Sequence, residues 1–478
     1  MCETAEKREL FERTPIPKAI LELALPAMAG QIILVIYNMA DSFFLGLTGS
    51  DAMITAVTVC MPAFLFLSAI ANLFGVGGAS VISRSLGNKL PERAGGACAF
   101  ALTGCMIVTL LYSAAVWRGM DRFLDLLGGY ESSVHRLARS YLFCTVVLGG
   151  IVTSMNVLLA HLIRAEGHSV HASIGIALGG VLNIFLDPLF MFVLLPPGRE
   201  ALGAAIATTL SNAAALGYFA VLLLKNRAKT VLTFRPNRAM LQNGIPHDVI
   251  ATGLPACVMT LLENISYAVL DNLASLEGIA VQAGLGIAKK VNMLAHCTVR
   301  GIAQGVLPLI GYNYAAGDWK RVRSAVTLST LLSVGIAAAC MGVCLLFSPQ
   351  LIGIFIRHAS PSLQYGADFL RILCVGAPFS ACAYACISFF QATGCGMRAF
   401  LLAVFRKGLL DIPMMFLLRR LFAVNGVVWA TPFTDIICCA LALALFKNFL
   451  HKHRDALQPS SAPMRILRTA DPLRSFRA

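Results

Sequence analysis

The chain has 478 residues, of which 58% are hydrophobic and only 13% are charged, and its mean hydropathy is +0.76. This balance excludes an ordinary soluble protein and indicates a polytopic membrane protein. The net charge of +14 does not imply a nucleic-acid partner, because basic residues collect in the cytoplasmic loops of membrane proteins. The 15 cysteines are scattered through apolar runs without metal-binding spacing, so we expect buried free thiols and no resident metal.

Residues 1–19 are polar and lack the apolar core of a signal peptide, so we expect the first apolar run to act as its own insertion signal. A membrane-spanning helix needs about 20 predominantly apolar residues. Twelve runs are long enough, at roughly 20–47, 53–82, 95–117, 137–161, 169–195, 201–224, 247–273, 279–312, 324–348, 366–391, 398–421 and 425–449. We therefore predict an all-α polytopic membrane protein with twelve transmembrane helices.

The placement of basic residues predicts the orientation. With residues 1–19 on the cytoplasmic side, the inner segments before the C-terminal tail hold 17 Lys and Arg residues, and the outer segments hold 8. This bias predicts a multi-pass protein of the plasma (cytoplasmic) membrane with both termini cytoplasmic. The basic tail, residues 450–478, is rich in Pro, Ser and Arg, and we expect it to be disordered.

The longest connection, residues 225–246, divides the chain into an N-lobe (20–224) and a C-lobe (247–449) joined by a cytoplasmic linker. The two halves match in order along the sequence. LALPAM parallels TGLPAC, RAEG parallels QATG, and an offset of 230 places Asp41 opposite Asp271. Two six-helix lobes with the same starting side are related by an axis along the membrane normal, and such folds bind substrate near the midplane.

The first run contains an acid well inside the apolar stretch. Asp41 lies five residues before Gly46, roughly 7–8 Å from the end of the run at 1.5 Å per residue. An acid near mid-membrane costs about 2.5–3.5 kcal/mol on insertion scales. Tyr37 and Asn38 share its helix face. The pattern indicates an ion or proton site that faces protein, and the alternative is a structural acid bonded to a neighbouring helix.

Four segments carry a resemblance to a known family. They are LALPAMAGQIILVIYNMADSFFLG, ANLFGVGGASVISRSLGNK, LNIFLDPLFMF and AQGVLPLIGYNYAAGDWKRV. Over about residues 15–450 the chain resembles the MATE (multidrug and toxic compound extrusion) family, in its DinF/MepA-like branch. The resemblance implies two six-helix lobes around a central V-shaped cavity. It also implies efflux of lipophilic, often cationic compounds, driven by inward H⁺ or Na⁺.

A coupling site is predicted in the N-lobe. Asn183 and Asp187 share a helix face, and Thr208 and Thr209 lie seven or eight residues into the next run, at a similar depth to Asp41. Carboxylate, amide and hydroxyl oxygens suit a shared proton or a transient Na⁺. The resemblance implies the same set, namely Asp41, Asn183, Asp187 and a threonine, for which we take Thr208. The alternative is a structural polar network.

The C-lobe also carries charged residues inside its runs, and they leave a second cation site open. Glu263 lies deep and is expected to meet a cationic substrate, whereas Asp271 lies close to the outer end and is exposed to solvent in the alternative interpretation. Basic residues of the eighth run need an acid or a wet cavity, and Glu263 is a candidate partner. On the eleventh run Lys407 and Asp411 form an i,i+4 pair that we interpret as structural. Asp435 has no evident partner.

Substrate contacts are assigned to aromatic, Met and polar side chains, which adapt to varied apolar ligands. The expected cavity residues are Tyr37, Asn38, Met155, Glu263, Tyr267 and Met293. Plain packing is the alternative for each of them. His161, His168 and His171 cluster near an inner helix end, and we interpret them as a solvated loop rather than a metal site.

No P-loop, nucleophile elbow or HEXXH motif occurs, so neither ATP drive nor an enzyme is indicated. We predict a secondary active multidrug antiporter without a cofactor, which exports lipophilic cations in exchange for H⁺ or Na⁺. Its expected partners are these small molecules and membrane lipids, and we expect a monomer. A lipid-linked precursor flippase and a narrow-substrate exporter of the same superfamily remain alternatives, and a receptor without cation-dependent flux is a more distant one.

Overall fold

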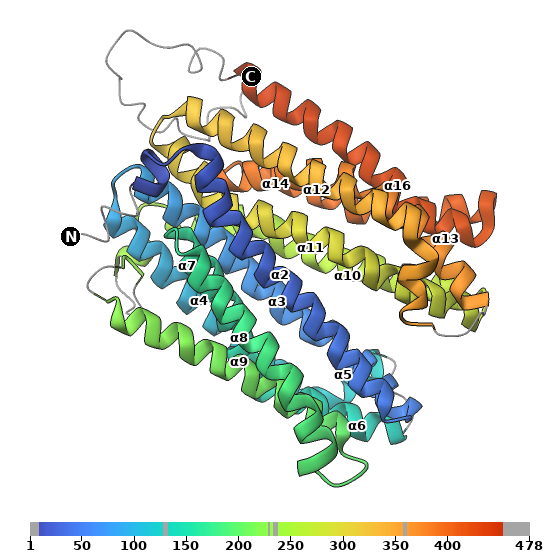
Figure 1. The fold of residues 1–478 in the computed structure, drawn as a ribbon. Coiled ribbons are helices and arrows are strands. Elements are labelled where there is room, and N and C mark those ends of the chain that lie inside the picture. The colour runs from blue at the N-terminus through green and yellow to red at the C-terminus, as the bar shows by residue number, and fades with distance from the viewer. Residues whose placement is uncertain (1–8, 128–131, 228–229, 233–237, 357–360, 453–478) are drawn as a thin grey trace, which may run out of the picture.

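The structure, a computed structural model, describes residues 9–127, 132–227, 230–232, 238–356 and 361–452. The described chain is almost entirely helical, and its long helices run roughly along one direction (Figure 1). The predicted disordered tail begins at residue 450, but residues 450–452 are helical; the rest of the tail, residues 453–478, lies outside the described ranges. Both ends of the described chain lie at the same end of the bundle, as an even number of crossings requires (Figure 1).

The first half of the chain forms helices that correspond to the first six apolar runs. These are α2 (Ile16–Leu47), α3 (Asp51–Gly87), α4 (Pro91–Arg118), α5 (Met120–Leu126), α6 (Ser132–Leu142), η1 (Phe143–Leu148), α7 (Gly150–Ala165), α8 (Ser169–Pro188), η2 (Leu189–Leu194) and α9 (Glu200–Lys225). The segments η1 and η2 are π-helical turns that continue α6 and α8.

The second half repeats this pattern. Its elements are η3 (Arg238–Leu241), α10 (Ile245–Ser275), α11 (Ile279–Ala315), α12 (Trp319–Gly353), α13 (Pro361–Val375), α14 (Ala377–Ala392), α15 (Gly396–Val404), η4 (Phe405–Leu410) and α16 (Asp411–Lys452). Another π-helical turn, η4, joins α15 to α16.

The number of membrane crossings agrees with the prediction. In the described part of the chain nine helices are long and apolar enough to cross a membrane, and two bent helix pairs, at 50° and 42°, raise the number to 11 if each pair is one crossing. The last of the nine, Gly396–Lys452, has 57 residues. At about 1.5 Å per residue it is far longer than a hydrocarbon core of about 30 Å. It breaks at Phe422 and Ala423, where Ala423 has φ 50°, so it supplies two crossings and completes twelve.

The two halves of the chain touch most extensively along the helix pairs α2 with α11 and α3 with α10, and α3 also contacts α11. Glycines permit this contact. A Cβ on Gly77 would lie 2.1 Å from the carbonyl oxygen of Val249, and one on Gly253 would lie 1.7 Å from that of Leu73. Backbone therefore packs directly on backbone between the lobes, as small residues allow in membrane bundles.

The N-terminal segment also crosses between the lobes. The Phe11 ring stacks on Tyr312 of α11 with centroids 5.0 Å apart. The Tyr312 hydroxyl donates to Glu12 at 2.6 Å, and the Arg321 guanidinium of α12 donates to the carbonyl oxygens of Phe11 and Thr14. The lobes are thus fastened at the end of the bundle where the described chain begins and ends.

Candidate functional site

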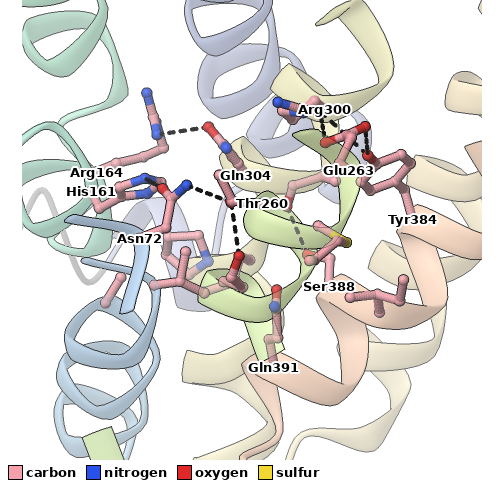
Figure 2. A pocket seen from close by; sticks show the side chains of 18 residues that line it. Asn72, His161, Arg164, Thr260, Glu263, Arg300, Gln304, Tyr384, Ser388 and Gln391 are labelled. Carbon is pink, nitrogen blue, oxygen red and sulfur yellow. Dashed lines mark hydrogen bonds and ion pairs between the residues drawn. The ribbon is translucent and has the colours of Figure 1, made fainter. Parts of the chain in front are cut away.

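A cavity lies between the lobes, next to the contact of α3 with α10. Figure 2 shows its polar side chains. Its volume is about 70 Å³, which is room for a few water molecules but not for a drug-sized ligand. Helices of both halves line it, namely α3, α7, α10, α11 and α14. The lining residues are Asn72, Val76, Ala79, His161, Arg164, Ala256, Met259, Thr260, Glu263, Arg300, Ala303, Gln304, Leu307, Pro308, Tyr384, Ile387, Ser388 and Gln391.

A hydrogen-bonded chain of side chains crosses the cavity from one lobe to the other (Figure 2). A ring nitrogen of His161 lies 3.2 Å from the Asn72 side-chain oxygen, and the Asn72 amide donates to the Thr260 hydroxyl at 3.0 Å. His161 is only 8% exposed. The interpretation of His161 as part of a solvated loop is therefore wrong, because the helix α7 continues past it and turns it into the lobe interface. His168 and His171 are half-buried.

On the N-lobe side the cavity holds a buried guanidinium. Arg164 lies in the last turn of α7 and is 2% exposed. One of its terminal nitrogens lies 3.5 Å from the Gln304 side-chain oxygen, at the limit of a hydrogen bond. The same oxygen accepts from the amide of Gln31 on α2 at 3.3 Å. Gln304 thus joins α2, α7 and α11 at the cavity wall.

On the C-lobe side the cavity holds an ion pair. The Arg300 guanidinium donates to Glu263 at 2.8 Å, and the Tyr384 hydroxyl donates to the other carboxylate oxygen at 3.2 Å (Figure 2). The expected partner of Glu263 among the basic residues of its neighbouring run is therefore Arg300. Lys289 instead pairs with Asp271. Glu263 does reach the cavity, as predicted, but its carboxylate is already bound by a cation of the protein.

Two further buried ion pairs lie deeper in the C-lobe, next to the pair of Arg300 and Glu263. Arg406 pairs with Asp435 at 2.7 Å, and Lys407 pairs with Asp411 at 2.7 Å. The Lys407–Asp411 pair is confirmed, and the structure supplies the partner of Asp435 that the sequence did not indicate, namely Arg406. The π-helical turn η4 carries both basic residues and shifts the helical register, so that both side chains enter the lobe interior. The Arg406 guanidinium also covers the Tyr384 ring at 4.6 Å.

The predicted coupling residues come together in the N-lobe, apart from the lining of this cavity. The Asn183 amide donates to Asp187 at 2.9 Å and lies 3.5 Å from the Thr208 hydroxyl. Asp187 is fully buried, and one of its carboxylate oxygens has no hydrogen-bond partner in the structure. The half-buried Asp41 lies close enough to Asp187 for their charges to interact. The Thr209 hydroxyl donates instead to the carbonyl oxygen of Ala205.

Of the six residues predicted to form the substrate cavity, only Glu263 lies in its lining. The other five are placed as follows and stay predictions. Tyr37 packs near Gly180, Asn38 donates to the Leu34 carbonyl oxygen, Met155 lies in the N-lobe core, Tyr267 lies between Lys289 and Lys407, and Met293 is 45% exposed.

Sequence reasoning missed four polar residues of the cavity wall, two from each lobe, namely Asn72, Arg164, Gln304 and Gln391. A signal for two of them was present, because the parallel of RAEG with QATG places Arg164 and Gln391 at equivalent positions of the two halves. Both line the cavity. Asn72 and Gln304 carried no comparable signal, since an amide within an apolar run can equally serve packing.

Comparisons with known proteins agree with this architecture. The family model described as MatE matches residues 26–189 and 255–417, one segment in each half. The multidrug export protein MepA of Staphylococcus aureus is 27% identical over 446 residues, which cover 92% of this chain and 95% of that protein. MepA of Staphylococcus haemolyticus is 27% identical over 434 residues, with 91% and 94% covered.

Solved structures show the same fold. A MATE crystal structure in complex with MaL6 superposes with a TM-score of 0.86 at 24% identity, covering 94% of this chain and 99% of that one. A transporter of the MOP superfamily from Pyrococcus furiosus superposes with a TM-score of 0.82 at 24% identity, covering 93% and 98%. The twelve-helix, two-lobed arrangement is confirmed. Since the matched segments span more than half of the chain, it belongs to the MatE family, whose members are membrane transporters and not enzymes.

Proposed function

We propose that the protein is a secondary active multidrug exporter that moves lipophilic compounds, cations among them, outward in exchange for H⁺ or Na⁺. The observation that carries the proposal is the N-lobe cluster of Asp41, Asn183, Asp187 and Thr208. Asp187 and Asn183 each keep one buried oxygen without a hydrogen-bond partner, and no basic residue pairs with Asp187 among those the structure describes. Oxygen donors without a counterion suit an exchangeable hard cation or proton.

Helix α2 connects this cluster to the cavity. Asp41 and Gln31 lie on it about 15 Å apart at 1.5 Å per residue, and Gln31 bonds to the cavity residue Gln304. Pro26 and Gly30 weaken the same helix, so cation binding at Asp41 can bend or repack it. Movement of α2 would then change the lobe contact and the cavity. Thermodynamic linkage requires that drug and cation weaken each other's binding.

The direction of transport follows the charge bias of the sequence. With both termini cytoplasmic, the end of the bundle fastened by Phe11 and Tyr312 faces the cytoplasm. The cavity then opens outward when the lobes separate at the opposite end, and drug leaves. Rocking to the inward-facing state requires the glycine contact between α3 and α10 to part. The resemblance to proteins named multidrug export protein supports this substrate class.

The test is ethidium efflux from loaded proteoliposomes under an imposed pH gradient or Na⁺ gradient. Flux driven by one gradient and lost in Asp41→Asn would support antiport and identify the ion. Asp121→Asn is the matched control, because Asp121 is 60% exposed on α5, where it pairs with His135 and Arg139 away from the cluster. No flux under either gradient, with folded protein, would contradict the proposal and favour a narrow-substrate exporter or a lipid-linked precursor flippase.

A further inference from the structure

Arg164 differs from the other basic side chain of the cavity wall. Its Nε and one terminal nitrogen are buried without a hydrogen-bond partner, and its one hydrogen bond is the 3.5 Å contact with Gln304. Arg300 across the cavity has a carboxylate at 2.8 Å. Within the described ranges no acid pairs with Arg164. Glu166, two residues later, accepts from the Thr230 hydroxyl and from the backbone N–H of Val231 in the linker.

The cavity lining therefore carries one positive charge in excess. Arg300 and Glu263 cancel, and Arg164 remains. A guanidinium stays protonated in proteins, so burial cannot remove its charge as it can for a lysine. An unpaired buried charge is unfavourable and is kept where a ligand completes it. The unused nitrogens of Arg164 are donors only, so the missing group is an acceptor with negative charge.

We propose that the cavity between the lobes binds the anionic group of its ligand, a carboxylate or an equivalent monovalent anion, at Arg164. The planar fork of a guanidinium matches the two oxygens of a carboxylate. The volume of about 70 Å³ admits the anionic group alone, so the lipophilic remainder packs against Val76, Leu307 and Ile387 only when the lobes separate. The subsite belongs to one lobe, because the equivalent position of the C-lobe is the neutral Gln391.

This inference rests on the proposed function in taking the cavity as part of the transport path, and it adds lipophilic acids and zwitterions to the cationic substrates. Glu263 alone would favour cations, but Arg300 already occupies its carboxylate. A ligand that carries both charges could engage Arg164 with its acid and compete with Arg300 through its amine. Substrates of purely cationic character would gain nothing from Arg164.

The test is equilibrium binding of two matched dyes to the purified full chain in detergent, followed by fluorescence anisotropy. Rhodamine B carries a free carboxylate, and its methyl ester keeps the same ring system without that charge. We expect Arg164→Gln to weaken the binding of rhodamine B at least about tenfold, because a charge-assisted hydrogen bond is lost. The affinity for the ester should stay within about twofold. Arg164→Lys keeps the charge but not the planar guanidinium, so its affinity for rhodamine B should lie between those of the wild type and Arg164→Gln. Arg139→Gln, on an exposed arginine, is the control.

A second arm separates an organic carboxylate from an inorganic anion. Chloride is exchanged for sulfate at constant ionic strength. If Arg164 holds chloride, chloride will compete with rhodamine B in the wild type but not in Arg164→Gln. Unchanged rhodamine B binding in Arg164→Gln, or equal loss of both dyes in a variant that still unfolds cooperatively, overturns the proposal. No ion gradient is used, so failure of antiport and failure of this subsite are distinguishable.

Discussion

The two lobes share a fold, but their acids inside the helix bundle have different partners. In the C-lobe, Asp411, Asp435 and Glu263 each have a basic partner at 2.7–2.8 Å. In the N-lobe, Asp187 has only the Asn183 amide, and one of its oxygens is unpartnered. The same contrast holds between positions related by the internal repeat. Lys289 binds Asp271, whereas Asp41 has no ion pair in the described part of the chain.

This difference indicates a division of labour between the lobes. A carboxylate that is permanently paired cannot exchange its cation with the solvent without breaking a buried ion pair, which is costly. A carboxylate with only neutral partners can. The C-lobe acids therefore act as internal counterions that hold the lobe together. Asp187 of the N-lobe has no such counterion in the described part of the chain, although the charge of Lys290 acts on its neighbour Asp41, and under the proposed function Asp187 is the acid open to an exchangeable cation.

The largest effect is expected from breaking the pair of Arg406 with Asp435. Asp435→Asn leaves a buried guanidinium without its counterion, and removal of one partner of a buried pair destabilises by about 3–5 kcal/mol. The unfolding temperature in detergent measures this loss. Asp187→Asn should lower it far less, because no cation is orphaned.

Two variants test the cause of this loss. Asp368→Asn removes the exposed partner of Arg371 and should cost no more than about 1 kcal/mol. The double substitution Arg406→Met with Asp435→Leu replaces the pair by apolar groups and should recover much of the stability. A double variant as unstable as Asp435→Asn would show that shape, not charge, dominates the site.

The next effect concerns the contact between the lobes. Gly253→Leu places a side chain where a Cβ alone would lie 1.7 Å from the Leu73 carbonyl oxygen, so α3 and α10 must separate. We expect a loss of about 1–3 kcal/mol in unfolding free energy, as for other overpacked sites. Gly217→Leu is the matched control, because nothing lies within 4 Å of its Cβ. Equal unfolding temperatures would mean that the lobes are not held at this contact.

The next prediction compares one acid of each lobe, with a smaller effect on stability but a clear effect on efflux. Asp187→Asn should abolish gradient-driven efflux, because it removes a carboxylate that we propose as a cation ligand in the N-lobe cluster. Asp271→Asn, at the exposed end of the C-lobe, should keep at least about half of the wild-type rate, since a half-exposed ion pair contributes little. Ethidium efflux from proteoliposomes measures both. Loss in Asp271→Asn alone would reverse the assignment of the lobes.

Sequence reasoning predicted what depends on local or additive properties. Twelve crossings follow from run length, and Lys407–Asp411 follows from i,i+4 spacing. It failed where tertiary packing decides. Arg406 and Asp435 are 29 residues apart, and nothing in their spacing indicates that α16 returns beside η4. Likewise the position of His161 near a helix end suggested solvent, but the opposite lobe covers that end.

The smallest effect distinguishes two adjacent hydroxyls. Thr208 lies 3.5 Å from the Asn183 amide, whereas Thr209 donates to the Ala205 carbonyl oxygen one turn earlier. Thr208→Val should weaken the binding of the coupling ion several-fold. This is about the effect of losing one neutral hydrogen-bonding group. Thr209→Val should leave it unchanged, because its hydroxyl is already used within α9. The ion concentration that gives half-maximal efflux measures both. A shift confined to Thr209→Val would place the ion on the other side of α9, beside Cys144, and would remove Asn183 from the cluster.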